Sequence, residues 1–216
     1  AAAEEGVCDW NEERAKIFVG GLPAALVQSP SGDRVFVSQV FPDRISVLDT
    51  TVDPPVLVDT DDDPLTTDPG YPSGITAIEL GDSRAGPWSM AMNPTGDWLY
   101  TTSYRQPFLY AIHLGVHADP DEVQPGDVFG INVDEPPGIR LRSDGLALSP
   151  EGSRLYFTNF TDTSVRVFSI DPSDGSNVVE IEQIPIPNAV ADIRHIAVHP
   201  DPDGSFVYVT SGGAAV

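Results

Sequence analysis

The sequence predicts an all-β protein made of four-stranded antiparallel sheets that follow one another along the chain. Two observations indicate this fold class. Short apolar runs alternate with polar residues at period 2, and clusters of Gly, Pro and Asp separate the runs. In addition, one turn motif returns four times along the 216 residues. Apart from a short turn around 11–15, no stretch has the 3.6-residue period of an amphipathic helix.

The repeated motif is a Pro–Gly turn between two β-rich runs. Its prolines lie at positions 30, 94, 150 and 200, so the copies are 50 to 64 residues apart. Proline fixes φ at the start of such a turn, and glycine supplies the positive φ that closes it. An aromatic residue recurs in the run after each turn, at Phe36, Tyr100, Tyr156, and Phe206 or Tyr208. Repeats of this length with four strands each are typical of β-propeller blades.

Each predicted blade contains an inner strand before the turn, a second strand after it, and two further strands. In the first blade the apolar run 24–27 precedes the turn, and 45–48 and 75–80 supply the third and fourth strands. We expect an N-terminal extension over 1–13 and a partial propeller over 14–216. Within it, 14–19 reads as the outer strand of a preceding blade. The predicted blades cover about 24–80, 87–133 and 144–186, with 193–211 incomplete.

The number of strands does not close a ring. Three full blades plus parts of two are too few strands for a closed ring, and they make about half of the seven-bladed ring that the family resemblance given below implies. Three explanations stay open: residues beyond Val216, two or more copies that close a ring together, or a tight four-bladed ring. We favour the first, because an open half-ring would leave a long unpaired strand edge.

One copy of the motif resembles a known repeat family. Residues 149–159 and 164–171 match the pattern of the YVTN-type β-propeller repeat, and 208–211 match its core with Ser in place of Asn. The resemblance implies a propeller related to surface-layer and lactonase-like seven-bladed proteins, some of which are attached to redox enzymes. It also implies an extracytoplasmic location: periplasmic, secreted or at the cell surface.

Composition excludes several partners. Asp and Glu total 33 against 11 Lys and Arg, which gives a formal net charge of −22 and a pI near 4.1. Such a surface repels nucleic acid and anionic lipid. No apolar run is long enough to insert into a membrane as a helix. Cys8 is the only cysteine, so we expect no internal disulfide and no Cys-based metal or haem motif.

A possible Ca²⁺ site lies in the acidic insertion of the first blade. Asp59, Asp61 and Asp63 alternate along the chain, as carboxylates do at the start of a calcium loop. Pro64 stands where such a loop needs glycine, and Gly70 where it needs glutamate. A solvated charge run is the competing interpretation.

The sequence contains no GxSxG, P-loop or GxGxxG motif. Aromatic and Arg residues instead recur near the ends of the predicted strands, and both types are enriched at binding surfaces. This recognition group comprises Trp88, Tyr104, Arg105, Arg142 and Arg194. Asn159 also begins a glycosylation sequon, although it occupies the Asn position of the repeat itself.

Two functions follow as expectations. The first is a non-catalytic, exported scaffold that binds a ligand or protein partner, or self-assembles at a surface. The alternative is a lactonase-like, metal-dependent hydrolase. In that case Asp144 and Asp192, which precede inner strands, would hold a divalent ion that polarises the substrate carbonyl.

Overall fold

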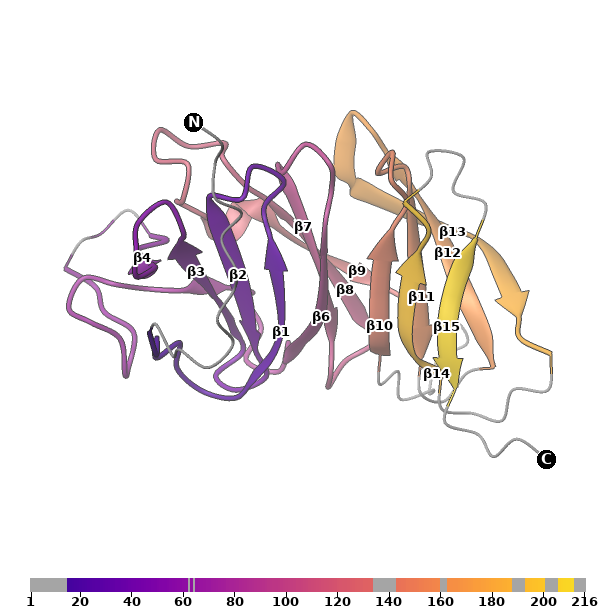
Figure 1. Cartoon of the computed structure of the whole chain (residues 1–216), viewed down its shortest axis with the longest axis horizontal. Coiled ribbons are helices and arrows are strands. Elements are labelled where there is room, and N and C mark those ends of the chain that lie inside the picture. Colours follow the sequence, from indigo (N-terminus) through magenta and orange to yellow (C-terminus); the bar gives the residue numbers. More distant parts are fainter. Residues whose placement is uncertain are drawn as a thin grey trace, which may run out of the picture.

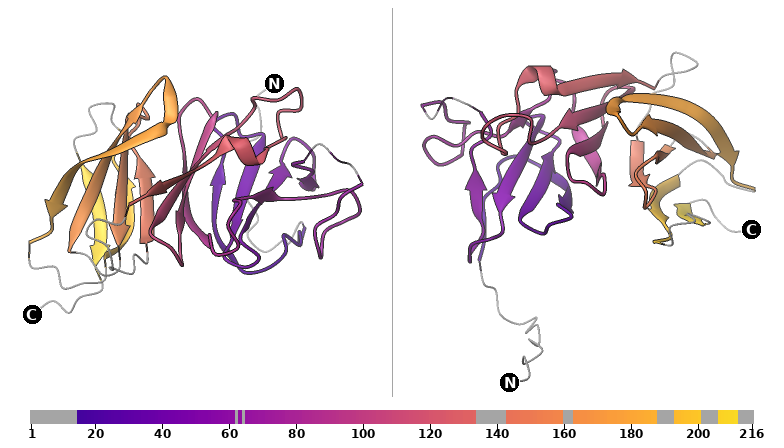
Figure 2. Two further views of the ribbon diagram at one scale, coloured as in Figure 1. Left: turned by 180° about the vertical axis from the view of Figure 1, so that it is seen from behind. Right: turned by 90° about the horizontal axis from the view of Figure 1, so that it is seen from above.

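The computed structural model describes residues 15–61, 63, 65–133, 143–159, 163–187, 193–200 and 206–211. These residues form antiparallel sheets that stand side by side along the long axis of the molecule (Figure 1). From above, the sheets are arranged around an arc (Figure 2). Within the described residues the only helical element is a short 3₁₀ turn, η1 (Pro125–Asp127). The predicted fold class, a partial β-propeller of four-stranded blades, is confirmed.

The first blade departs from the simple four-stranded pattern. Its strands are β1 (Pro23–Gln28), β2 (Arg34–Gln39), β3 (Arg44–Asp49), β4 (Val56–Val58) and β5 (Ile78–Glu79). Both β4 and β5 pair with β3: β4 pairs with its last half and β5 with its first. The single fourth strand expected at 75–80 is therefore reduced to two residues. The Pro- and Asp-rich insertion lies between β4 and β5. Residues 47–49 of β3, which β5 does not reach, pair with β4.

The second and third blades are four-stranded meanders in chain order. The second comprises β6 (Pro87–Met92), β7 (Trp98–Ser103), β8 (Phe108–His113) and β9 (Val128–Asn132). The third comprises β10 (Ser143–Leu148), β11 (Arg154–Asn159), β12 (Ser164–Asp171) and β13 (Asp174–Pro185). The last sheet is the pair β14 (Ile193–Val198) and β15 (Val207–Ser211). The domain bounds at 13/14 and 216 stay predictions.

The strand expected at 14–19 is not present over 15–19. This segment is bound by side chains instead of by a strand ladder. The Val19 carbonyl accepts hydrogen bonds from Ser46 Oγ at 2.9 Å and from the Tyr71 hydroxyl at 2.8 Å. Because side-chain hydroxyls of the first blade donate hydrogen bonds to the Val19 carbonyl, the segment lies against that blade without extending its sheet.

Apolar side chains fill the space between neighbouring blades. One cluster joins the first and second blades, another the second and third, and a third the third and fourth. The recurrent aromatic position lies in these clusters: Phe36, Tyr100 and Tyr156 are 5%, 1% and 5% exposed. The Tyr100 hydroxyl donates to the Gly175 carbonyl at 3.0 Å, and burial raises the pKa of this phenol.

Each inner strand has a register shift near its start, in β1, β6, β10 and β14. A buried hydroxyl of the second strand lies at this irregularity. Ser38 Oγ accepts from Ala25 N at 3.0 Å and donates to the Trp88 carbonyl of the next blade at 3.0 Å. Thr158 Oγ1 likewise donates to the Arg194 carbonyl of the next blade at 3.1 Å. Hydroxyls on β2 and β11 thus fix the start of β6 and β14, respectively.

Candidate functional site where the inner strands begin

The two ends of the blades carry different kinds of residue. We call the end where β1, β6, β10 and β14 begin the strand-start face, and the end with the Pro–Gly turns 29–34, 93–98 and 149–154 the turn face. Four of the five residues of the predicted recognition group lie at the strand-start face and are described: Trp88, Tyr104, Arg105 and Arg194. The fifth, Arg142, lies outside the described residues.

Three successive inner strands present different chemistry at one equivalent position. Trp88, Asp144 and Arg194 are the second residues of β6, β10 and β14. They align when the chain is counted back from the turn prolines. The carbonyls of Trp88 and Arg194 accept from equivalent hydroxyls, which places them at the same level of the ring. The position therefore offers an aromatic ring, a carboxylate and a guanidinium in series.

Asp144 and Arg194 belong to adjacent backbones. A Cβ on Gly145, the residue after Asp144, would lie 2.7 Å from the Arg194 carbonyl oxygen. Only glycine permits this approach, so β10 and β14 meet closely beside these two residues. Asp144 is 9% exposed, whereas Arg194 is exposed. A buried carboxylate on one strand and an exposed guanidinium on the neighbouring strand are suited to acid–base chemistry on a bound polar group.

Trp88 and Tyr104 form an aromatic pair. Their ring centroids are 4.9 Å apart with 29° between the planes, which is a stacked arrangement. The Tyr104 amide donates to the Gly86 carbonyl at 2.8 Å and so fixes the β7–β8 loop against the segment that leads into β6. Both side chains are half-buried.

Arg105 joins the first two blades. Its Nη2 donates to the Val40 carbonyl at 2.7 Å, and its Nη1 lies 3.6 Å from Asp43 Oδ2. Its guanidinium also lies 5.7 Å from the centroid of the Phe41 ring. Asp43, at φ 61°, accepts from the Gly86 amide at 2.7 Å. These contacts occupy much of Arg105, so its evident role is to hold the β2–β3 loop.

A cavity of about 440 Å³ opens beside this contact. It lies between the β2–β3 loop and the segment that follows β5, and its charged lining residues are Asp43, Arg44, Glu79 and Asp82. Arg44 Nη2 donates to Glu79 Oε1 at 3.0 Å, and Arg44 is also ion-paired with buried Asp68. Burial raises the pKa of Asp68. The volume is in the range of small-molecule pockets.

The carboxylates proposed for Ca²⁺ bind their own loop. Asp59 Oδ1 accepts from the Thr76 amide and hydroxyl at 3.0 and 2.7 Å. Asp61 and Asp63 each accept from an amide two residues further on, at 2.9 and 3.0 Å. No group of three or more His, Cys, Asp or Glu side chains within the described residues is arranged to hold a metal ion. Calcium binding stays a prediction.

Two further expectations concern residues near this face. Asp192 lies outside the described residues, so its position relative to Asp144 is not given. Asn159 is 1% exposed at the end of β11. Its buried side chain fits the structural role of the repeat asparagine and is inaccessible to glycosylation in the folded chain.

Sequence analysis missed residues that position this face. Ser38 and Thr158 read as ordinary strand residues, yet their hydroxyls hold Trp88 and Arg194. Counting from the turn prolines would have found them, because both lie at the same offset from Pro30 and Pro150. The role of Asp43 could not be predicted in this way, because its partner Arg105 is distant in the sequence.

Comparison with known proteins identifies the fold. No family model and no curated protein matches the chain. Among solved structures, it is similar to a putative 6-phosphogluconolactonase from Bacteroides uniformis, with TM-score 0.61 and 18% identity over 88% of this chain and 50% of that one. It is also similar to the periplasmic gluconolactonase of Pseudomonas aeruginosa, with TM-score 0.63 and 19% identity over 88% and 47%. The β-propeller domain of a Myceliophthora Cps50 (Swd1) protein matches with TM-score 0.52 and 13% identity over 83% and 47%.

These similarities define the class of the protein as a β-propeller. The chain spans about half the length of the structures that it matches. The expectation of a non-catalytic scaffold is corrected here: solved structures that share this fold include proteins described as lactonases, so the fold does not point to a scaffold. Within the described part of the chain, no helix is long and apolar enough to span a membrane.

Proposed function

We propose that this chain forms part of a lactone hydrolase whose reaction takes place at the strand-start face. The observation that carries the proposal is the series Trp88, Asp144 and Arg194 at one equivalent position of three successive inner strands. The similarity to propellers described as gluconolactonases supports it. The repeats share their turns and strands but carry a different residue at this position. Trp88 supplies an apolar binding surface, Asp144 a base and Arg194 a cation.

Lactone hydrolysis requires a base and a group that stabilises the oxyanion. Water attacks the ring carbonyl carbon, and the carbonyl oxygen gains negative charge. Arg194 would donate hydrogen bonds to that oxygen. Asp144 would take a proton from the attacking water and return it to the ring oxygen as the ring C–O bond breaks. The products are one hydroxy acid for each lactone and water consumed.

Trp88 would bind the apolar face of the lactone ring. An aromatic side chain offers a broad apolar surface to such a ring, and stacking on Tyr104 keeps the indole in place. Arg105 takes no part in the chemistry of this proposal. It would position the β2–β3 loop through its bond to Val40.

A divalent ion would polarise the same carbonyl. Within the described residues, however, the fit is incomplete: Asp144 supplies one carboxylate, and no group of three candidate ligands is present. We therefore derive no step through a metal. Dialysis against EDTA followed by activity measurement tests metal dependence directly.

We also propose that the repeat is of the YVTN type and that the protein is extracytoplasmic. The match over 149–159 and 164–171 supports the first, and the net charge of −22 is compatible with the second. Cell fractionation with detection of the native protein tests the location. Recovery in the cytoplasmic fraction alone would contradict it.

The decisive experiment measures hydrolysis of a lactone panel by the protein as isolated from its source. The panel includes glucono-δ-lactone and its 6-phosphate, and acid release is followed in a pH-stat. We expect Asp144→Asn to lower kcat about 10²-fold or more and Arg194→Gln about 10²- to 10³-fold. Trp88→Ala should mainly raise KM.

Two matched controls carry the same chemical changes elsewhere. Asp174→Asn changes the exposed first residue of β13, and Arg84→Gln lies on an exposed loop before β6. Both should retain wild-type kcat. The proposal fails if no lactone of the panel is hydrolysed, or if Asp144→Asn and Arg194→Gln keep wild-type activity.

A further inference from the structure

A second cavity lies at the turn face, between the first and second blades. Its volume is about 240 Å³. The residues that line it come from the β1–β2 turn, the β6–β7 turn, the strands β2, β3 and β5, and the loop after β8. It lies at the opposite end of the strands from Trp88, Asp144 and Arg194, so it is independent of the proposed lactone site.

The floor of this cavity is apolar. Its members are Phe36, Val47, Ile78 and Leu114, and all are 9% exposed or less. They belong to the core cluster between the first two blades, so their positions are fixed by packing. A cavity of about 150 Å³ with walls of this kind accepts benzene. This larger cavity therefore has room for one ring with a short polar arm.

The rim of the cavity carries more negative than positive charge. Arg34 is its one cation and is already engaged: Nε and Nη2 donate to the two oxygens of Asp121 at 2.7 and 2.8 Å. Arg34 Nη1 lies 3.2 Å from Asp49 Oδ1 and donates to the Asp33 carbonyl at 3.0 Å. An anion at the rim would have to displace these carboxylates.

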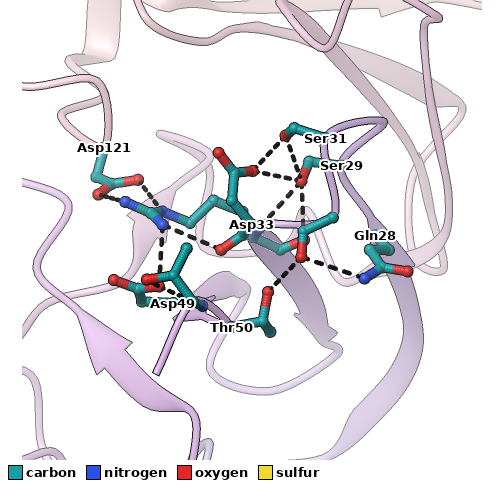
Figure 3. Close-up of polar contacts among 10 residues, drawn as sticks. Gln28, Ser29, Ser31, Asp33, Asp49, Thr50 and Asp121 are labelled. Atoms are coloured by element: carbon teal, nitrogen blue, oxygen red, sulfur yellow. Dashed lines mark hydrogen bonds and ion pairs between the residues drawn. The ribbon is translucent and has the colours of Figure 1, made fainter. Parts of the chain in front are cut away.

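Asp33 is the rim carboxylate that the Arg34 guanidinium does not bind, and Figure 3 shows its contacts with Ser29 and Ser31. Its Oδ1 accepts from Ser29 Oγ at 2.7 Å and from Ser31 Oγ at 2.5 Å. These bonds lower the pKa of Asp33 and keep it ionised at neutral pH. Both bonds go to Oδ1, so neither serine occupies Oδ2.

We propose that this cavity binds a small organic cation with an apolar body, such as a primary amine on an aromatic ring. The ring rests on Phe36, Val47, Ile78 and Leu114, and the ammonium group lies at Asp33. The apolar floor selects for the ring, and the charge at the rim selects for the cation over a neutral or anionic ligand of the same size.

Three aromatic probes of similar size but different charge test the proposal: benzylamine, benzyl alcohol and benzoate. Binding to the intact protein is followed by isothermal titration calorimetry at 50 mM NaCl. We expect benzylamine to bind at least tenfold more tightly than benzyl alcohol, and benzoate not to bind. Raising NaCl to 500 mM should weaken benzylamine binding and leave benzyl alcohol unchanged.

Asp33→Asn should reduce benzylamine affinity to that of benzyl alcohol. Asn retains an oxygen that accepts from Ser29 and Ser31, so the turn is kept. The matched control is Asp97→Asn: Asp97 holds the equivalent place in the β6–β7 turn but does not line the cavity. The proposal is overturned if benzoate binds as well as benzylamine, if no probe binds, or if both variants have the same effect.

Discussion

The Arg34 guanidinium of the first blade and the Asp121 carboxylate of the second form a two-fold hydrogen-bonded ion pair, with N–O distances of 2.7 and 2.8 Å (Figure 3). The two residues are 87 positions apart in the chain. Burial of the pair is partial, with side chains 21% and 12% exposed. The pair links β2 to the long β8–β9 connection.

Removing this carboxylate should destabilise the contact between the first two blades. Asp121→Asn replaces two charge-assisted bonds by at most one weaker bond, so we expect a loss of about 1.5–3 kcal/mol in the free energy of unfolding. Urea denaturation followed by circular dichroism measures it. Asp119→Asn is the control, since Asn can still accept from the Asp121 amide in that turn. Equal losses in both variants would show that the pair has no special role.

Stability should depend on the charge of Glu180. Arg166 is 3% exposed and donates to Glu180 Oε1 at 2.9 Å. Burial alone would raise the pKa of Glu180, but the hydrogen bonds from Arg166 and Gln183 and the positive charge of Arg166 together outweigh burial and lower the pKa below 4.5. As pH falls, the Glu180 carboxylate therefore takes up its proton at a higher pH in the unfolded chain than in the folded chain. The stabilisation is present above pH 4.5 and is lost as pH drops through the folded-state pKa.

Glu180→Gln removes this pH-dependent contribution. It leaves a buried guanidinium without its carboxylate, so we expect a loss of roughly 3 kcal/mol at pH 7. The difference from wild type should shrink between pH 5 and 3, in urea denaturation at each pH. Glu182→Gln, two residues away on β13, should follow the wild-type pH profile. A constant difference across that window would contradict the assignment.

The buried hydroxyl of Ser38 should be needed for stability. Ser38→Ala leaves the Ala25 amide and the Trp88 carbonyl without this partner, which should cost about 1–3 kcal/mol. Ser38→Thr should restore most of it, because Thr102 and Thr158 hold the equivalent positions of the next two blades. Chemical denaturation of the three proteins measures this. Ser173→Ala, in an exposed turn, serves as the control; no loss in Ser38→Ala would contradict the role.

Gly175 should not tolerate a side chain. A Cβ there would lie 2.4 Å from Trp98 Cδ2. Trp98 is 8% exposed and cannot move without repacking the core, so Gly175→Ala should cost about 1–3 kcal/mol. Thermal unfolding followed by tryptophan fluorescence measures it. At Gly126 an added Cβ meets nothing within 4 Å, so Gly126→Ala should leave stability unchanged or slightly raised. The reverse order of stability would refute the packing argument.

The candidate site could be predicted in part. The sequence pointed to Trp88 and Arg194, and separately to Asp144, but not to their equivalent places on three inner strands. It placed Arg105 in the recognition group but gave no sign that Arg105 Nη2 bonds a carbonyl 65 residues away. It also gave the first blade one outer strand, whereas β4 and β5 share the edge of β3. Each of these points depends on contacts between segments that are distant in the chain.

The sequence by itself determined the all-β class, the repeated unit and the order of the strands. Those properties depend on period-2 alternation and on Pro–Gly turns, whose geometry is set within a few neighbouring residues. Only the tertiary structure decided which hydroxyl meets which carbonyl, that Arg34 pairs with Asp121, and that the backbones of β10 and β14 meet at Gly145 and Arg194. These relationships arise between blades, because the side chains meet only when the apolar faces of successive sheets have packed together.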